Sequence, residues 1–412
     1  MTDTAGAPLE PKATYGPGTG ASPTGEGAVR RRHRWLRGAA LGTAVLVLGA
    51  GGAGWAAYQK LNGNITKDTD AAAELARYDR ERPAPLVHDA QNILLIGSDT
   101  RAGDNRKYGR DRGTQRSDTT ILLHLAADRQ SATAVSIPRD LMVDVPGCRR
   151  PDGSRTRAQF AQFNSAFEVG GTACTIRTVE KLTRIRVDHH MVVDFAGFKD
   201  MVDAVDGVEV CIKAPIDDAD AHVRLVPGPQ TLDGEQALGY VRARKSLGNG
   251  SDTERMDRQQ EFLGALVNKV QSNDVLLNPA KLYPVLDAAT SSLTTDPALA
   301  SLRGLYELVR GMRNIPTERV QFLTVPRRSY TYDANRDELV EPAAEQLFTR
   351  LRTDSPVAVV PERPEKPRET GPSQEQAYSG SGDGDGKPDD PSHTPSPAPT
   401  FRGNTAAGAA CE

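Results

Sequence analysis

The sequence predicts an α/β sandwich with a mixed central sheet, preceded by a single transmembrane helix. Three short apolar runs, at residues 92–97, 119–125 and 133–137, have the length and composition of buried strands. Further along the chain, segments that are typical of helices alternate with more strand-like runs, which favours layers of helices packed on a sheet. An uncharged apolar run from Gly38 to Tyr58 comes before all of them.

Gly and Pro concentrate at the two ends of the chain and limit the part that can fold. Of the 412 residues, 38 are Gly and 28 are Pro. Residues 1–29 and 356–412 show no apolar period that could build a core, and deleting residues 362–412 is expected to leave the fold intact. The chain is therefore divided into a disordered basic cytoplasmic tail (1–37), a transmembrane helix (38–58), an extracellular stalk (59–88), a folded domain (89–355) and a disordered tail (356–412).

The uncharged run predicts both a membrane span and its direction. At about 1.5 Å per residue, a helix over 38–58 crosses a hydrocarbon core of roughly 30 Å. Several arginines stand just before this run and only Lys60 follows it closely, so the N-terminus is expected in the cytoplasm and the later residues outside. A cleaved signal peptide is the alternative, and the long basic region and long span disfavour it.

The cysteines agree with an oxidising compartment. Cys148, Cys174 and Cys211 lie in the foldable region, and Cys411 lies in the tail. Because three partners cannot all pair, one disulfide with one spare thiol is the simplest expectation, and we favour Cys148–Cys174. Buried free thiols are the alternative. The chain has no CxxC pair and no HExxH motif, so we expect no zinc site, and the His189-His190 pair is interpreted as structural.

The expected strand pairing brings charged residues together. The first strand leads into residues 98–101 (SDTR), and the second begins directly after residues 116–118 (RSD). A short polar link joins the second and third strands, so they are expected to form an antiparallel hairpin. If the first two strands also pair antiparallel, residues 138–140 (PRD) at the end of the third strand reach the same edge. Three clusters of Arg and Asp would then converge at one end of one sheet.

Two more arginine groups follow downstream. Residues 233–240 predict a short helix that leads into Arg242 and Arg244, and an extended stretch there would place both arginines on one face. Ser251 or Asp252 is a natural N-cap for the next helix, which predicts that Arg255 lies in its first turn.

The position of these helix-start arginines suggests an anion. Cations are disfavoured at a helix N-terminus by some tenths of a kcal/mol, and a bound anion at the helix start would reverse that sign. The alternative is partial neutralisation of Arg255 and Arg258 by the acidic residues Asp252, Glu254 and Asp257.

Taken in order, these motifs resemble the LytR-CpsA-Psr family of cell-wall phosphotransferases. The resemblance runs from about residue 92 to 270 through NILLIGSDTR, RSDTTILLHL, VSIPRDLMVDVPG, FNSAFEVGG, LDGEQALGYVRAR and SDTERMDRQQ. It implies an α/β/α sandwich with a groove for a polyprenyl tail. It also implies transfer of a phosphoglycan from a polyprenyl-pyrophosphate carrier to a peptidoglycan sugar hydroxyl, with release of polyprenyl phosphate. The implied partners are that carrier-linked glycan, peptidoglycan and the lipid bilayer, and not nucleic acid.

The resemblance also implies roles for individual residues. Asp99 and Asp118 match the family's metal aspartates, and oxygen ligands suit Mg²⁺ (or Mn²⁺). The matching phosphate-binding and catalytic set is Arg101, Arg116, Arg139, Arg242, Arg244, Arg255 and Gln259, with Arg258 and Asp252 close to it. Asp118 or Asp252 is expected to act as general base, and Arg139 to act on the reacting phosphate. The chain departs from the family in carrying Glu254 and Asp257 around Arg255, which weakens the expected phosphate affinity there.

Other readings of the sequence stay open. Phe160, Phe163 and Phe167 form one aromatic stripe and Phe195 and Phe198 another, and such stripes are either ordinary core or part of a lipid bed. A membrane-bound transcriptional attenuator is one rival function, although the basic tail contains no helix-turn-helix. A polyprenyl-pyrophosphate-binding protein or pyrophosphatase, with water as acceptor, is the other.

Overall fold

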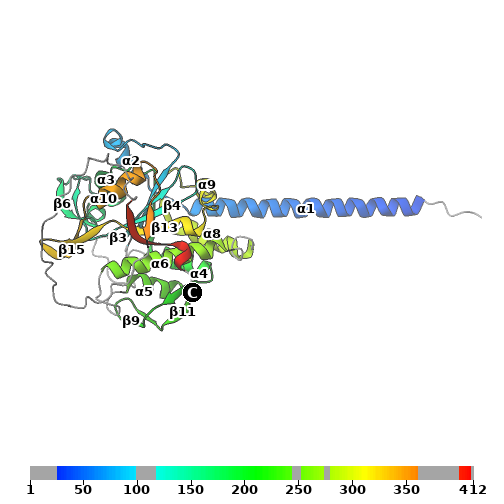
Figure 1. The fold of residues 1–412 in the computed structure, drawn as a ribbon. Coiled ribbons are helices and arrows are strands. Elements are labelled where there is room, and N and C mark those ends of the chain that lie inside the picture. Colours follow the sequence, from blue (N-terminus) through cyan, green and yellow to red (C-terminus); the bar gives the residue numbers. More distant parts are fainter. Residues whose placement is uncertain (1–25, 99–116, 244–251, 273–278, 361–398, 410–412) are drawn as a thin grey trace, which may run out of the picture. The chain divides into compact units, whose positions relative to one another are not determined.

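The computed structural model describes residues 26–98, 117–243, 252–272, 279–360 and 399–409, in two units that divide after Tyr58 (Figure 1). The first helix, α1 (Glu26–Asn64), contains the predicted span. Its part from Leu41 to Asn64 is the one helix in the described residues that is long and apolar enough to cross a membrane. Residues 26–37 were predicted to be disordered, and this was wrong because the helix already includes the arginine run, whose residues are good helix formers.

A mixed sheet forms the centre of the second unit. In order across the sheet, its described strands are β1 (Thr66–Lys67), β12 (Leu293–Thr295), β7 (His189–Asp194), β2 (Gln91–Ser98), β3 (Ser117–Leu125), β4 (Ala132–Ile137), β13 (Val320–Thr324), β17 (Thr400–Thr405) and β16 (Ala358–Val360). The expected pairing is confirmed: β2 runs antiparallel to β3, and β3 runs antiparallel to β4.

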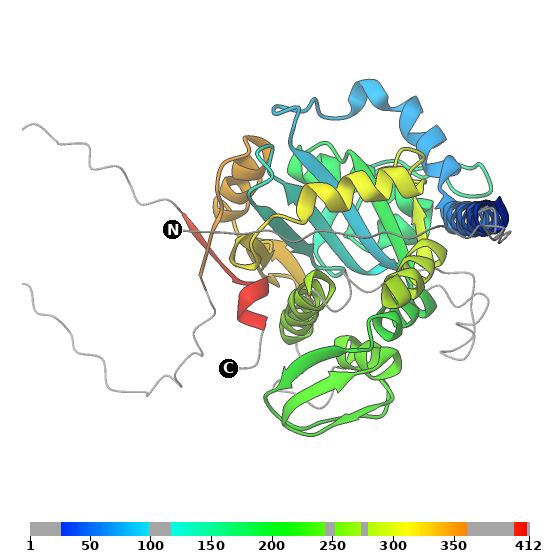
Figure 2. The ribbon, with the colours of Figure 1, turned by 90° about the vertical axis from the view of Figure 1, so that its right-hand side faces the viewer.

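Helices cover both faces of this sheet, as expected for an α/β/α sandwich (Figures 1 and 2). Side chains alternate along β2, so Leu94 faces one apolar core while Ile93 faces another. The first core contains residues of α2 (Thr69–Arg77), α3 (Ser165–Thr183) and α10 (Ala343–Arg352). The second contains residues of α6 (Asp252–Gln271) and α9 (Leu302–Met312). Both faces of the central strands are therefore buried, which fixes their register.

Smaller antiparallel pairs complete the fold. They are β5 (Met142–Val145) with β6 (Gln159–Gln162), β8 (Val208–Ile212) with β11 (Gly228–Leu232), β9 (Ile216–Asp218) with β10 (Val223–Leu225), and β14 (Arg327–Tyr330) with β15 (Asp333–Leu339). The green strands β8 to β11 stand apart from the main sheet in Figure 2. They share a third apolar core with α4 (Phe195–Ala204), α5 (Gly234–Arg242) and Phe262 of α6, beside α8 (Pro279–Ser292).

The segment that was predicted to be a stalk is part of this unit. Ala71 and Leu75 of α2 are buried in the first core, because the helix is amphipathic. Arg82 donates to both carboxylate oxygens of Glu180 at 2.7–3.1 Å, and Glu180 is itself 3% exposed. His190 lies 3.3 Å from Asp68, the N-cap of α2, which agrees with its structural interpretation.

The C-terminal region also departs from the prediction. Residues 356–412 were expected to be disordered, but β17 pairs with β13 on one side and β16 on the other. Phe401 is 5% exposed, and Ala406 is fully buried. The carbonyl of Ala406, in the short helix η4 (Ala406–Ala409), accepts a hydrogen bond from Asn268 of α6 at 2.7 Å. One apolar side chain among Gly and Pro carries almost no periodic signal, so the sequence pattern missed this strand.

The favoured disulfide is confirmed, and the spare thiol is not. Cys148 and Cys174 are bonded, with their Cα atoms 5.6 Å apart, and they tie the end of the β5 strand to α3. Cys211 is disulfide-bonded as well, so none of the described cysteines is a free thiol.

Removing the C-terminal strand should destabilise the protein. Deleting residues 399–412 from the full chain removes buried Phe401 and the strand pairing, so we expect the free energy of unfolding to fall by about 3 kcal/mol or more. Denaturant unfolding of the detergent-solubilised protein measures this. Deleting residues 362–390, which removes no described residue, is the control. Equal stability of the two deletion variants would contradict the assignment of β17 to the core sheet.

Candidate functional site

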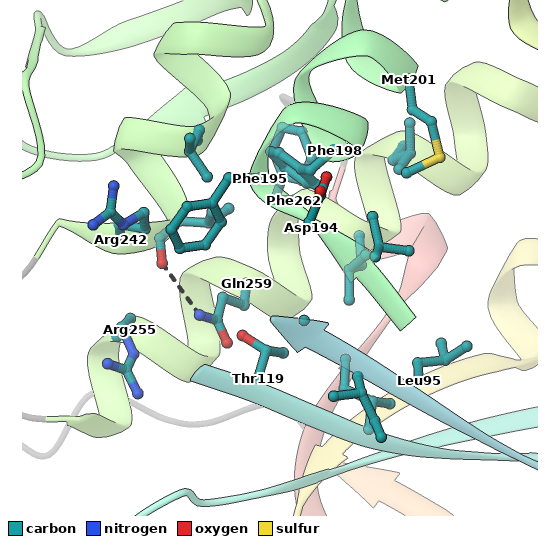
Figure 3. A pocket seen from close by; sticks show the side chains of 18 of the residues that line it. Leu95, Thr119, Asp194, Phe195, Phe198, Met201, Arg242, Arg255, Gln259 and Phe262 are labelled. Carbon is teal, nitrogen blue, oxygen red and sulfur yellow. Dashed lines mark hydrogen bonds between the residues drawn. The ribbon is translucent and has the colours of Figure 1, made fainter. Parts of the chain in front are cut away.

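A cavity of about 930 Å³ opens between the sheet and the helices α4, α5 and α6 (Figure 3). Its floor is formed by residues of β2, β3 and β7, including Leu95, Ile121 and Met191. Its walls are formed by apolar residues of the three helices: Phe195, Phe198, Met201, Leu238, Val241, Phe262, Leu263 and Leu266. The size and the lining suit a long apolar ligand.

One of the two aromatic stripes belongs to this cavity. Phe195 and Phe198 of α4 line it, and the ring of Phe198 packs against Phe262 with centroids 5.5 Å apart. The other stripe is divided between two environments: Phe163 and Phe167 are buried in the first core, whereas Phe160 is 55% exposed. The spacing of the rings could not distinguish these cases, because both stripes lie at helical intervals.

Polar residues gather at one side of the cavity. Arg242 of α5 and Arg255 and Gln259 of α6 line it together (Figure 3). Arg139, from the segment after β4, also lines the cavity. Arg139 donates to Asp140 at 3.2 Å. The guanidinium of Arg242 lies over the ring of Phe195, 4.7 Å from its centroid, where a cation is favoured. The amide of Gln259 donates to the Val241 carbonyl at 3.2 Å and so ties α6 to the end of α5.

Local sequence explains how α5 and α6 present these side chains. Asp233 caps α5 in a reciprocal capping box with Gln236, which confirms the predicted helix start. The helix continues through Arg242 and has Ala243 as its C-cap, so the extended stretch that would place Arg242 and Arg244 on one face is not present at Arg242. Arg255 lies within the first turn of α6, as predicted, and is only 4% exposed.

Arg258 is not brought to this cavity. It is 8% exposed and donates to the carbonyl of Ala243, beside Tyr240 and Glu261 in a separate hollow. Burial lowers the pKa of Arg258, while the neighbouring Tyr240 and acidic residues oppose that shift. Burial, together with Glu261, raises the pKa of Tyr240. The structure thus places Arg258 where it holds the end of α5, outside the cavity that Arg242 and Arg255 line.

The remaining predicted site residues fall outside the described side chains. Asp99, Arg101, Arg116 and Arg244 lie outside the described residues, and only the backbone is described for Asp118 and Asp252. The strand register still locates their neighbours: Ser98 pairs with Ser117 on one side and with Asp194 on the other. Gly97 pairs with Thr119 and Ser98 pairs with Ser117, so Asp118 is an extra residue between the two pairs. Such a β-bulge often occurs next to an active site.

Sequence reasoning missed three cavity carboxylates: Asp194, Asp218 and Asp220. Asp194 caps α4 by accepting from the Gly197 amide at 2.8 Å, and an Asp three residues before the glycine of DFAG was a readable N-cap signal. Asp218 is 3% exposed and accepts from the backbone amides of Asp220 and Ala221. No cluster of three His, Cys, Asp or Glu side chains that could hold a metal occurs within the described residues.

Comparisons with known proteins agree with this geometry. The chain is 36% identical over 293 residues to a protein of Corynebacterium glutamicum named "Probable cell wall biosynthesis protein LcpB", covering 68% of this chain and 66% of that protein. The chain therefore spans just under two thirds of the length of LcpB. It is 31% identical to a Bacillus subtilis protein named polyisoprenyl-teichoic acid–peptidoglycan teichoic acid transferase TagT, covering 76% of this chain and 93% of TagT.

A solved structure and a family profile extend the match. The crystal structure of Bacillus subtilis TagV superimposes with a TM-score of 0.51 at 25% identity, covering 65% of this chain and 98% of the TagV chain. The profile of the LytR_cpsA_psr family matches residues 58–353, which is most of the chain and includes every described residue of the candidate site. This protein belongs to the LytR-CpsA-Psr family.

Proposed function

We propose that this protein transfers a phosphoglycan from a polyprenyl-pyrophosphate carrier to a sugar hydroxyl of peptidoglycan, and releases polyprenyl phosphate. One observation carries the proposal: a large apolar cavity ends in a group of arginines. A polyprenyl pyrophosphate has the same division, with a long apolar chain attached to a strongly anionic head. The names of TagT and TagV as polyisoprenyl-teichoic acid–peptidoglycan teichoic acid transferases support the same reaction class.

The cavity walls supply the energy for holding the lipid. Each 100 Å² of apolar surface removed from water contributes roughly 2.5 kcal/mol. The polyprenyl chain would lie among the leucines and phenylalanines of β2, α4 and α6. Its pyrophosphate would then lie beside Arg139, Arg242 and Arg255. Arginine forks hold phosphate oxygens in pairs and stay charged at any relevant pH.

The proposed chemistry is a phosphoryl transfer. The acceptor hydroxyl attacks the phosphorus that carries the glycan, a new P–O bond forms, and the bond to polyprenyl phosphate breaks. Such transfers are accelerated chiefly by positioning and by neutralisation of the developing charge, which the arginines supply. The hydroxyl proton passes to a carboxylate, for which we propose Asp118 or Asp252. The pyrophosphate linkage is already activated, so no nucleotide is required.

We propose that Asp99 and Asp118 hold one Mg²⁺ against the pyrophosphate. The donor chemistry fits, because carboxylate oxygens suit Mg²⁺ and the ion needs few protein ligands when phosphate oxygens and water complete its shell. The strand register also fits, because Ser98, directly before Asp99, pairs with Ser117, directly before Asp118. When bound, the ion supplies positive charge to the phosphate oxygens.

The membrane arrangement follows from the same function. We propose a single-pass protein with its N-terminus in the cytoplasm and the second unit outside, where peptidoglycan lies. The arginines before the apolar helix support this direction, and disulfides persist in oxidising compartments.

Replacing Arg139 should slow transfer. Arg139→Ala removes a charged hydrogen-bonding partner worth about 1.5–3 kcal/mol, so we expect turnover to fall roughly 10- to 150-fold. Arg139→Lys should also be impaired, because an ammonium group cannot reproduce the fork. The measurement is transfer from a labelled lipid-pyrophosphate donor to peptidoglycan fragments, with product analysis to separate transfer from hydrolysis. Arg319→Ala, at an exposed position that does not line the cavity, is the matched control. Near-normal turnover of folded Arg139→Ala protein would sink the assignment.

Asp99→Asn should change the metal requirement. Removing one charged oxygen ligand should shift half-maximal activity to about tenfold or higher Mg²⁺ concentration, since even supporting residues of metal sites matter on this scale. A Mg²⁺ titration of the transfer rate measures this. Asp89→Asn, at an exposed position just before the other end of β2, is the control and should leave the titration unchanged. An Asp99→Asn titration that overlays the wild-type curve would exclude Asp99 as a ligand.

The orientation can be tested in cells. A protease added outside intact spheroplasts should digest the region after residue 60, while an epitope placed before residue 25 stays protected. A cytoplasmic protein should survive in the same sample as a control for intact membranes. Digestion of the N-terminal epitope with protection of the second unit would reverse the proposed direction.

A further inference from the structure

Three aromatic rings gather on an exposed surface near the arginine side of the cavity. Phe160 of β6 packs against Tyr330 of β14 with ring centroids 6.2 Å apart, and Tyr330 packs against Tyr332 at 5.4 Å. Phe160 is 55% exposed and Tyr332 is 86% exposed. These three residues are called the aromatic cluster. Large rings that are exposed side by side mark an interaction surface more often than scattered single ones do.

The aromatic cluster is connected to Arg139 through a short chain of contacts. Asp140 lies between them: one of its oxygens accepts from Arg139 at 3.2 Å, and the other accepts from Gln162 at 2.5 Å. Gln162 and Phe160 are two residues apart in β6, so they project from the same face of that strand. Arg336 of β15 approaches the same carboxylate at 3.8 Å. In Figure 1, β6 and β15 lie together at one side of the sheet.

The separation along this path is short. The backbone amide of Asn164 donates to the carbonyl of Arg139 at 3.0 Å. Phe160 is four residues from Asn164, which corresponds to roughly 13 Å of extended chain. If the pyrophosphate lies at Arg139, the glycan attached to it needs only a few sugar units to extend to the aromatic cluster.

A basic surface continues beyond the rings. The turn between β5 and β6 carries four exposed arginines, Arg149, Arg150, Arg155 and Arg157, and none of them forms an ion pair with any residue that the structure describes. Asp152 is the one acidic residue within residues 149–158. The hydroxyl of Ser154, which bonds to its carboxylate, keeps the pKa of Asp152 below its usual range. The turn that carries these four arginines is called the basic hairpin. The Cys148–Cys174 disulfide ties its base to α3.

We propose that the aromatic cluster and the basic hairpin bind the phosphate-bearing saccharide chain of the donor, beyond its pyrophosphate. This inference rests on the proposed function and names the part of the substrate that the outer surface holds. Sugar rings have apolar faces that pack on aromatic rings, and Arg336 and Asp333 beside the cluster can bond to their hydroxyls. Phosphates that recur along the chain pair with the four arginines, whereas an uncharged sugar strand would leave those arginines unmatched.

The proposed subsite predicts a dependence on donor length. Binding energy from a remote part of the substrate should favour donors whose glycan is long enough to reach it. The test compares two synthetic polyprenyl-pyrophosphate donors, one with a single N-acetylglucosamine and one with an oligomer of N-acetylglucosamine 1-phosphate. We expect Phe160→Ala/Tyr332→Ala to reduce kcat/KM about tenfold for the long donor and to leave the short donor unchanged. Arg155→Gln/Arg157→Gln should lower it about 3- to 10-fold, with the loss shrinking at high salt.

Matched control variants carry the same changes elsewhere. Tyr306→Ala removes a 61% exposed ring of α9, and Arg313→Gln/Arg319→Gln removes two exposed charges that follow α9 in the chain. Neither should affect either donor. Equal losses for long and short donors in the cluster variants would overturn the proposal, as would a change confined to the KM for peptidoglycan fragments, which would assign the surface to the acceptor.

A binding measurement separates this inference from the proposed reaction. The full chain in detergent is titrated with a lipid-free oligomer of N-acetylglucosamine 1-phosphate and, separately, with the uncharged N-acetylglucosamine oligomer. The phosphate oligomer should bind more tightly, and the cluster and hairpin variants should weaken it by the same factors as above. Absence of transfer with binding retained would sink the proposed function and keep the subsite. Transfer without any length preference or oligomer binding would sink the subsite alone.

Discussion

The antiparallel pairing of β2 with β3 determines where the charged residues of this chain can meet. Both faces of β2 are buried, so a slip by one residue would move Ile93 and Leu94 into the wrong cores. The same register places the end of β2 beside the start of β3 and beside Asp194 at the end of β7. The helices that cover this end then add Arg242 and Arg255 to one rim of an apolar space. The pairing register of the strands, and not the charge of any one motif, therefore brings these residues together.

The apolar walls and the buried arginines reinforce each other. A guanidinium that is 4% exposed, as in Arg255, is held in low-dielectric surroundings where an anion attracts it more strongly than in water. Several like charges close together also repel, and an anionic ligand relieves that repulsion. Arg258, outside the cavity, and Gln259, in its lining, both support this arrangement, because they donate to backbone carbonyls at the end of α5. In the proposed function, the walls would therefore hold the lipid and also strengthen the contacts of the arginines to its head group.

Local patterns predicted the features that depend on nearby residues. The β3–β4 hairpin and the start of α6 follow from a short link and a cap, and the structure confirms them. The β2–β3 pairing and the Cys148–Cys174 bond were favoured among open alternatives, and both are confirmed. The sequence did not predict the packing of α2, the helical end of α5 at Arg242, or strand β17. Each of these depends on a partner far along the chain: Phe401 is buried only because it meets the sheet, and nothing next to it in sequence signals that contact. Arg258 was expected close to the phosphate-binding set, because its position in the helix does not by itself reveal whether it faces a cavity.

The late position of β17 in the chain has a consequence for biogenesis. Ribosomes and export channels deliver a polypeptide from its N-terminus, so the membrane helix and the strands β2 to β4 emerge long before residues 400–406. Until those residues arrive, β13 lacks one neighbour, and α6 lacks the hydrogen bond between Asn268 and Ala406. A growing chain can therefore be anchored and partly folded while α6, which carries Arg255 and Gln259, is still incompletely supported. Residues 400–406 therefore complete the sheet beside β13 and the packing of α6 only after the rest of the domain has left the ribosome.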